Sequence, residues 1–214
     1  MAEFKEKKGL FGRFIDMISG KPAEEETNKK VEGKKSPPLV INEEEGFDLG
    51  FVKRFTHSGG KFLYCDDENE AYTYIRLIME ESGLGKIYCK NENLISILRK
   101  ANVDISEDFL ESDAFCSECE YLVAFNGGIM LSANQLKGKT LEELPETFIT
   151  IARTSQITDK LRTALAGIRV KYHNNLPSQI TTIKGPIKLD DIEENDTGKI
   201  CSKEIYLLLL EDQL

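Results

Sequence analysis

Short apolar segments alternate with amphipathic helical segments along residues 43–210, and this alternation constrains the fold more than any other feature of the sequence. Apolar runs of about four to eight residues between Gly, Pro, Asn or Asp are typical of strands, whereas apolar residues three or four positions apart are typical of helices. Strands that alternate with helices indicate βαβ units. We therefore predict an α/β fold with a mostly parallel or mixed sheet flanked by helices.

The individual elements follow from the same periodicity. It predicts helices at residues 43–57, 68–82, 91–100 and 155–172. It predicts strands at residues 61–65, 86–89, 103–105, 121–125, 129–131, 148–152, 179–184 and 204–210. In the last helix, the apolar residues predicted to face inward are Ile157, Leu161, Leu165 and Ile168.

Residues 120–134, EYLVAFNGGIMLSAN, join two predicted strands through Asn126, Gly127 and Gly128. Asn-Gly between apolar runs is a strong hairpin signal. Adjacent glycines also allow positive φ and let another group approach the main-chain N–H donors. The segment therefore predicts a buried hairpin whose turn either only reverses the chain or also faces a ligand.

The N-terminal arm differs in composition from the rest of the chain. Residues 1–19 place aromatic and aliphatic residues near helical spacing opposite Lys and Arg, which predicts an amphipathic helix, although two glycines weaken it. Residues 20–42, rich in Lys, Glu, Pro and Gly, are typical of a flexible linker, so we assign residues 43–214 to the α/β domain. The helix could dock on a partner or on this domain, lie on a membrane surface, or be a frayed terminus.

Charge and cysteine content narrow the function classes. The formal net charge of −9 argues against a general nucleic-acid binder, which needs a basic surface. No apolar run is long enough to span a bilayer, and the N-terminus lacks the features of a secretory signal. An odd number of cysteines, five, fits reduced thiols in the cytoplasm.

Two further loops carry polar groups where ligands gather in α/β folds, at the carboxyl ends of strands. Arg153, Thr154 and Ser155 at the start of a predicted helix could cradle an anion, or they could form an ordinary N-cap. The acidic residues at 190–193 could hold a cation or act as a general base, or they could form a solvated loop.

Other familiar motifs are absent or incomplete in the sequence. Cys116 and Cys119 form its only CxxC, and neither His57 nor His173 is spaced to complete a metal site, so packing explains these thiols better. The chain has no GxGxxG, Walker A or GxSxG motif. We predict no metal and no cofactor.

Taken together, these loops resemble the LUD domain, the family of lactate utilisation protein C (LutC-like proteins), over residues 45–212. The segments that carry the resemblance are CEYLVA at 119–124, the turn at 126–128, Leu144-Pro145, the segment IKGPIKLDDIE at 183–193, Gly198 and the final strand. The resemblance implies a fold similar to the NagB/RpiA/CoA-transferase group. It also implies a role in oxidising L-lactate to pyruvate with partner subunits that carry iron–sulfur clusters, since this chain has too few cysteines for them.

Two departures from the family pattern remove hydroxyl groups. The turn at 126–128 lacks the family's Thr and Ser, and Ile187 and Leu189 replace a Ser and a Thr after Gly185-Pro186. As a hypothesis, Gly127 and Gly128 would offer N–H groups, Arg153 would pair with a carboxylate, and Asp191 with Glu193 would orient donors or bind a partner's basic group. The residues predicted to bind a ligand are Asn126, Gly127, Gly128, Arg153, Thr154, Ser155, Gly185, Pro186, Asp191 and Glu193.

Three function classes remain open at this point. The first is an accessory component of a lactate-utilisation system that binds a small carboxylate or partner subunits. The second is an independent enzyme of the sugar-phosphate isomerase or CoA-transferase type that acts on an anionic small molecule. The third is a scaffold without a ligand. This class stays open because similarity of fold alone does not establish an activity.

Overall fold

The computed structural model of the chain describes residues 46–186 and 199–212. All of them lie in the unit that spans residues 38–214. The predicted helix at 1–19, the predicted linker at 20–42 and the first residues of the helix predicted at 43–57 lie outside the described residues. The domain boundary at residue 43 therefore stays a prediction.

Six parallel strands of the described chain form the larger of two sheets, in the order β1-β11-β7-β4-β2-β3. Because all six run the same way, their carboxyl ends lie at one edge, which confirms the predicted α/β architecture. The strands are β1 (Lys61–Cys65), β2 (Lys86–Tyr88), β3 (Asp104–Ser106), β4 (Ala114–Ser117), β7 (Thr147–Arg153) and β11 (Glu204–Leu210).

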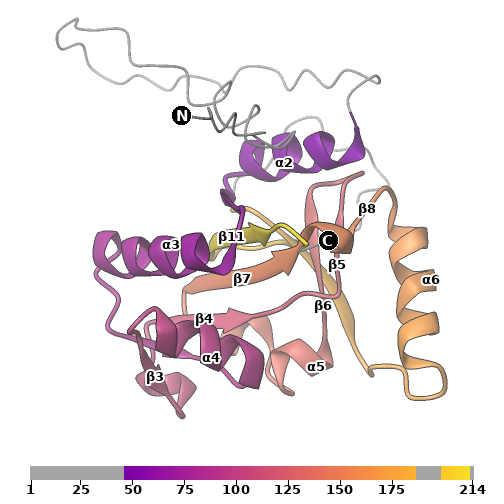
Figure 1. Ribbon diagram of the computed structural model, residues 1–214. Helices are drawn as coiled ribbons and strands as arrows, with labels where there is room; N and C mark the ends of the chain where they lie inside the picture. The colour runs from indigo at the N-terminus through magenta and orange to yellow at the C-terminus, as the bar shows by residue number, and fades with distance from the viewer. Residues whose placement is uncertain (1–45, 187–198, 213–214) are drawn as a thin grey trace, which may run out of the picture. The chain divides into compact units, whose positions relative to one another are not determined.

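Two helices cover one face of the larger sheet (Figure 1), α3 (Glu68–Glu81) and α4 (Glu92–Lys100). Each helix starts where the sequence predicts, because Asp67 and Asn91 accept hydrogen bonds from the first free backbone N–H groups. The apolar side of each helix packs on every second residue of the strands, which forms a continuous buried cluster.

The smaller sheet has the order β10-β9-β6-β5-β8 and contains the predicted hairpin. Strands β5 (Tyr121–Val123) and β6 (Gly128–Ser132) are antiparallel, and α6 (Leu161–Tyr172) packs against them through Ala164 and Ile168. Figure 1 shows this helix alongside β5 and β6. The predicted hairpin is confirmed. It lies in this smaller sheet and not in the larger parallel sheet. The remaining α-helices and strands are α2 (Phe47–His57), α5 (Ala133–Leu136), β8 (Ile157–Thr158), β9 (Ile180–Lys184) and β10 (Lys199–Ile200).

The helix predicted at 155–172 is interrupted, and this prediction is wrong at residues 157–160. Residues Thr154–Gln156 form a short 3₁₀ helix. Ile157 and Thr158 pair with β5 as strand β8, and the helix starts only at Leu161. The position of Ile157 in the apolar pattern is typical of a helical face, but the backbone of Ile157 pairs with β5 in the smaller sheet. Leu165, predicted to face inward, is 36 % exposed. The short buried strand β4 was also missed, since its four residues carry no periodicity.

Gly127 and Gly185 let two loops approach α2. The antiparallel pairing of Ile129 with Ile183 brings the two glycines to the same end of the smaller sheet. Gly127 has a φ of +64°, and a Cβ there would lie 2.7 Å from the Phe55 backbone nitrogen. At Gly185, a Cβ would meet the backbone of residues 58–60. Both glycines therefore serve close packing against the protein itself.

Glu120 links α5 and α6 to the smaller sheet through hydrogen bonds. Its side chain is fully buried and accepts hydrogen bonds from Lys171 Nζ (2.8 Å), Tyr172 Oη (2.8 Å), Ser132 Oγ (2.7 Å) and Gln135 Nε2 (3.0 Å). Burial by itself raises the pKa of this carboxyl, but the four donors outweigh burial and the pKa of Glu120 is lowered. The carboxylate is thus charged and fully partnered inside the fold.

Replacing Gly127 with alanine tests the packing against α2. We expect Gly127→Ala to lower the free energy of unfolding by about 3 kcal/mol, because positive φ and the clash with α2 both act. Gly138 is the matched control, since it has a φ of +76° and open space around it. Gly138→Ala should cost only about 1 kcal/mol, for the backbone conformation alone. Equal losses in urea unfolding would show that α2 makes no tight contact.

Glu120→Gln tests the buried carboxylate. We expect the variant to lose about 3 kcal/mol at pH 7, because it leaves Lys171 without its charged partner. The lowered pKa means that the Glu120 contribution is complete above the unfolded pKa, near 4.5, and disappears as the pH falls through the lower folded pKa. Stability curves against pH should therefore be flatter in this region for the variant. The exposed Glu80→Gln serves as control and should keep the wild-type curve; identical curves for wild type and Glu120→Gln would contradict the prediction.

Candidate functional site

The predicted site loops fall into two groups in the structure. The turn at 126–128 and Gly185-Pro186 come together beside α2, where Asn126 Oδ1 accepts a hydrogen bond from the Gly128 N–H (3.1 Å) and Ser58 Oγ accepts one from the Gly185 N–H (3.2 Å). These N–H groups therefore have partners within the protein. Residues 153–155 lie at the carboxyl end of β7, and Asp191 and Glu193 lie outside the described residues.

Thr154 and Ser155 bind a carboxylate, but it is the chain's own Asp212. Thr154 Oγ1 and the Ser155 N–H both donate to Asp212 Oδ2, at 2.9 and 2.6 Å. Burial raises the pKa of Asp212, yet these donors prevail and hold its pKa below the usual range. The anion-binding chemistry predicted for this loop is present, with Asp212, beyond the end of β11, as its occupant.

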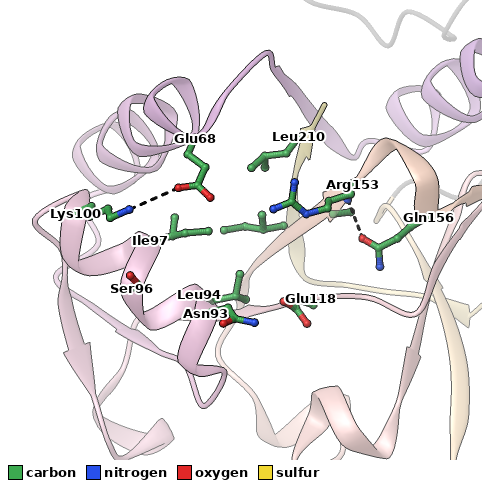
Figure 2. A pocket seen from close by; sticks show the side chains of 12 residues that line it. Glu68, Asn93, Leu94, Ser96, Ile97, Lys100, Glu118, Arg153, Gln156 and Leu210 are labelled. Carbon is green, nitrogen blue, oxygen red and sulfur yellow. Dashed lines mark hydrogen bonds and ion pairs between the residues drawn. The ribbon is translucent and has the colours of Figure 1, made fainter. Parts of the chain in front are cut away.

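Arg153 instead lines a cavity of about 450 Å³ at the carboxyl edge of the larger sheet. Figure 2 shows its walls, with Glu68 and Lys100 on one side and Glu118 and Gln156 on the other. Apolar residues that include Ile97, Ile151 and Leu210 complete the lining. The cavity lies where loops and helix ends converge in parallel sheets, and none of residues 126–128, 185 or 186 lines it.

The two cationic side chains that line this cavity, Lys100 and Arg153, differ in their partners. Lys100 Nζ lies 3.6 Å from a Glu68 carboxylate oxygen and 3.1 Å from the Tyr72 hydroxyl, so Lys100 is already paired. The Arg153 guanidinium makes no side-chain hydrogen bond or ion pair with the described residues. Its charge still contributes to the lowered pKa values of Glu68 and Asp212. Arg153 is thus a cation at the cavity whose side-chain donors have no partner among the described residues.

Of the described residues, Arg153 is the one lining this cavity that the sequence predicts as a site residue, and Glu118 and Gln156 are among the polar residues that this prediction missed. Gln156 is held by its own hydrogen bonds, since Oε1 accepts from the Arg153 N–H (2.7 Å) and Nε2 donates to Cys119 O (2.7 Å). The Glu118 carboxylate makes no side-chain hydrogen bond or ion pair among the residues at 46–186 and 199–212. Its position just after β4 would have pointed to it, had that strand been recognised.

The CxxC thiols lie in different surroundings. Cys119 Sγ accepts a hydrogen bond from Gln156 Nε2 (3.8 Å), whereas Cys116 lies beside Cys89, the residue that follows β2. Within the described part of the chain, no three His, Cys, Asp or Glu residues gather where they could hold a metal ion. No helix in that part is long and apolar enough to cross a membrane.

Residues 50–210 match the model of the LUD domain family. Lactate utilization protein C of Geobacillus sp. (strain WCH70) is 30 % identical over 148 residues, which cover 65 % of this chain and 57 % of that protein. Lactate utilization protein C of Geobacillus thermodenitrificans (strain NG80-2) is 31 % identical over 102 residues, or 47 % of this chain and 41 % of that protein.

The chain therefore spans about half the length of the curated relatives that it matches. A crystal structure of a DUF162 family protein from Deinococcus radiodurans shares the fold, with a TM-score of 0.55 and 13 % identity over 77 % of this chain and 95 % of that chain. Because the family model covers both sheets and the carboxyl edge with its cavity, the chain belongs to the LUD domain family.

Proposed function

We propose that this protein is an accessory component of a lactate-utilisation system and that it binds a carboxylate through Arg153. The two curated relatives are named for lactate utilisation, and the chain shares its family with them. The observation that carries the proposal is the Arg153 guanidinium, which lines the cavity at the carboxyl edge without a side-chain partner among the described residues. Guanidinium binds carboxylates through two parallel hydrogen bonds.

Glu118 gives the cavity a second polar contact of opposite charge. L-Lactate carries a carboxylate and a hydroxyl on adjacent carbons, so it offers one acceptor group and one donor group. In this proposal the carboxylate pairs with Arg153 and the hydroxyl donates to Glu118. Pyruvate lacks the hydroxyl and would leave Glu118 without that hydrogen bond, so the site would favour the hydroxy acid.

The volume of the cavity supports a further element of the proposal. About 450 Å³ lies within the range of about 300–1,000 Å³ typical of small-molecule sites, and it is far more than a three-carbon acid fills. A carboxylate presented by a larger molecule, or by a partner subunit, would occupy the cavity better. Oxidation of lactate releases two electrons, and the proposed partners are the iron–sulfur subunits that would accept them.

The same volume favours one competing function. An independent enzyme acting on a larger anion, such as a sugar phosphate or a CoA ester, would also use Arg153 and would fill more of the cavity. The two functions differ in the ligand that binds tightly. Titration with L-lactate, pyruvate, a sugar phosphate and a CoA ester therefore separates them.

Arg153→Ala is the decisive variant. We expect L-lactate to bind the wild-type chain in calorimetric titration and the variant to bind at least about tenfold more weakly, because a charge-assisted hydrogen-bond pair is lost. Arg169→Ala is the matched control, since Arg169 is exposed on α6 and does not line the cavity; it should bind as the wild type does. Glu118→Gln should reduce the preference for L-lactate over pyruvate.

Two outcomes would contradict the proposal. One is a wild-type chain that binds neither L-lactate nor pyruvate and co-purifies with no iron–sulfur subunit from cells grown on lactate. The other is tight binding of a sugar phosphate or CoA ester that depends on Arg153, which would support the competing enzyme function.

A further inference from the structure

Cys89 and Cys116 bring two thiols together at the carboxyl edge of the larger sheet. Strands β2 and β4 are parallel neighbours in which Tyr88 pairs with Phe115, so the residues that follow each of these are adjacent. Both thiols point to the face covered by α3 and α4, because both belong to the buried cluster on that face. The two side chains interact, which shifts their pKa values in opposite directions. The two cysteines are thus neighbours on the same face of the sheet.

This geometry is compatible with a covalent bond between the sulfurs. Neighbouring strands lie about 4.8 Å apart, and disulfides join residues whose Cα atoms are about 4.4–6.8 Å apart. Cys89 directly follows the last residue of β2, and Cys116 lies near the end of β4. Few backbone hydrogen bonds between the two strands would therefore have to shift when the sulfurs join. By contrast, Cys119 contacts Gln156, although it lies only three residues from Cys116.

The thiols are buried, yet each residue borders a cavity. Cys116 lines a cavity of about 200 Å³ together with Lys90, Lys137 and Lys171. Cys89 lines another, of about 480 Å³, between α4 and β3. A small oxidant can therefore approach the pair from the cavities even though the two residues are only 2 % and 1 % exposed.

The surroundings favour a thiolate at one position of the pair. The interaction with the Cys116 side chain and a backbone hydrogen bond at Asn91, with a smaller contribution from the Lys137 charge, lower the pKa of Cys89 despite burial and the nearby Glu118 charge. The same interaction and burial raise the pKa of Cys116. Such an asymmetry assigns the nucleophile to Cys89 and the resolving thiol to Cys116.

We propose that Cys89 and Cys116 form a reversible dithiol–disulfide pair that reacts with small peroxides. In the first step the Cys89 thiolate attacks one oxygen of hydrogen peroxide, the O–O bond breaks, and Cys89 sulfenic acid and water form once the leaving hydroxide is protonated. In the second step the Cys116 sulfur attacks the Cys89 sulfur, the S–O bond breaks, and the leaving hydroxide takes the Cys116 proton to form a second water. The two thiols are oxidised by two electrons, and one peroxide is reduced to two waters.

The test uses the full chain, first reduced and then exposed to hydrogen peroxide while folded. After denaturation and alkylation, the number of free thiols should fall from five by two, and dithiothreitol should restore them. Trypsin places Cys89 in the peptide 87–90 and Cys116 in the peptide 101–137, which also contains Cys119. Fragmentation of the linked peptides then assigns the bond to Cys116.

Variants separate this pair from the other cysteines. Cys89→Ser and Cys116→Ser should each abolish the link, whereas Cys65→Ser, a change of another buried thiol, should retain it. Thermal melting of each reduced variant establishes that it is folded before oxidation. Five free thiols in the oxidised wild type, a bond between Cys116 and Cys119, or a sulfinic acid at Cys89 without any link would each overturn the proposal.

Discussion

The parallel pairing of β11 with β1 on one side and β7 on the other holds the larger sheet together. The last described strand of the chain is inserted between two strands that lie far away in sequence, with Leu208 opposite both Leu63 and Ile151. Its apolar residues are buried on both faces, so the driving force is the burial of surface rather than any local turn. This pairing also brings Asp212 to the loop after β7, and therefore decides what occupies Thr154 and Ser155.

The internal carboxylate changes how the carboxyl edge should be interpreted. A loop with a hydroxyl and free N–H groups is a suitable anion site in general. Here Asp212 satisfies these groups, which leaves Arg153 as the member of the loop that faces the cavity. The positive charge of the exposed Arg153 also helps to keep the pKa of Asp212 low.

The glycine loops and the cavity serve different purposes. Gly127 and Gly185 lie where the smaller sheet approaches α2, and the space that a ligand would need is filled by Phe55 and by the backbone at residues 58–60. The cavity and the Cys89–Cys116 pair lie at the carboxyl edge of the larger sheet, around the ends of β2, β4 and β7. In this molecule, a position at the carboxyl edge of the parallel sheet predicts the candidate site better than the presence of glycines in a loop does.

The sequence by itself determined most of the strands and helices, although not the short strands β4 and β8, because periodicity, caps and turn residues act over a few neighbouring positions. Strands at 61–65 and 204–210, the helix capped by Asp67 and the hairpin around Gly127 all follow from such local signals. It also singled out Arg153. Local periodicity failed at Ile157, where pairing with a distant strand outweighed helical spacing.

Only the tertiary structure decided which of these elements are neighbours. The division into two sheets, the contact of Asp212 with Ser155, the place of Cys116 beside Cys89 and the place of Glu118 at the cavity all join residues that are distant in sequence. Such contacts depend on strand order and register, which are fixed by how the whole set of apolar faces is buried. No local pattern carries that information.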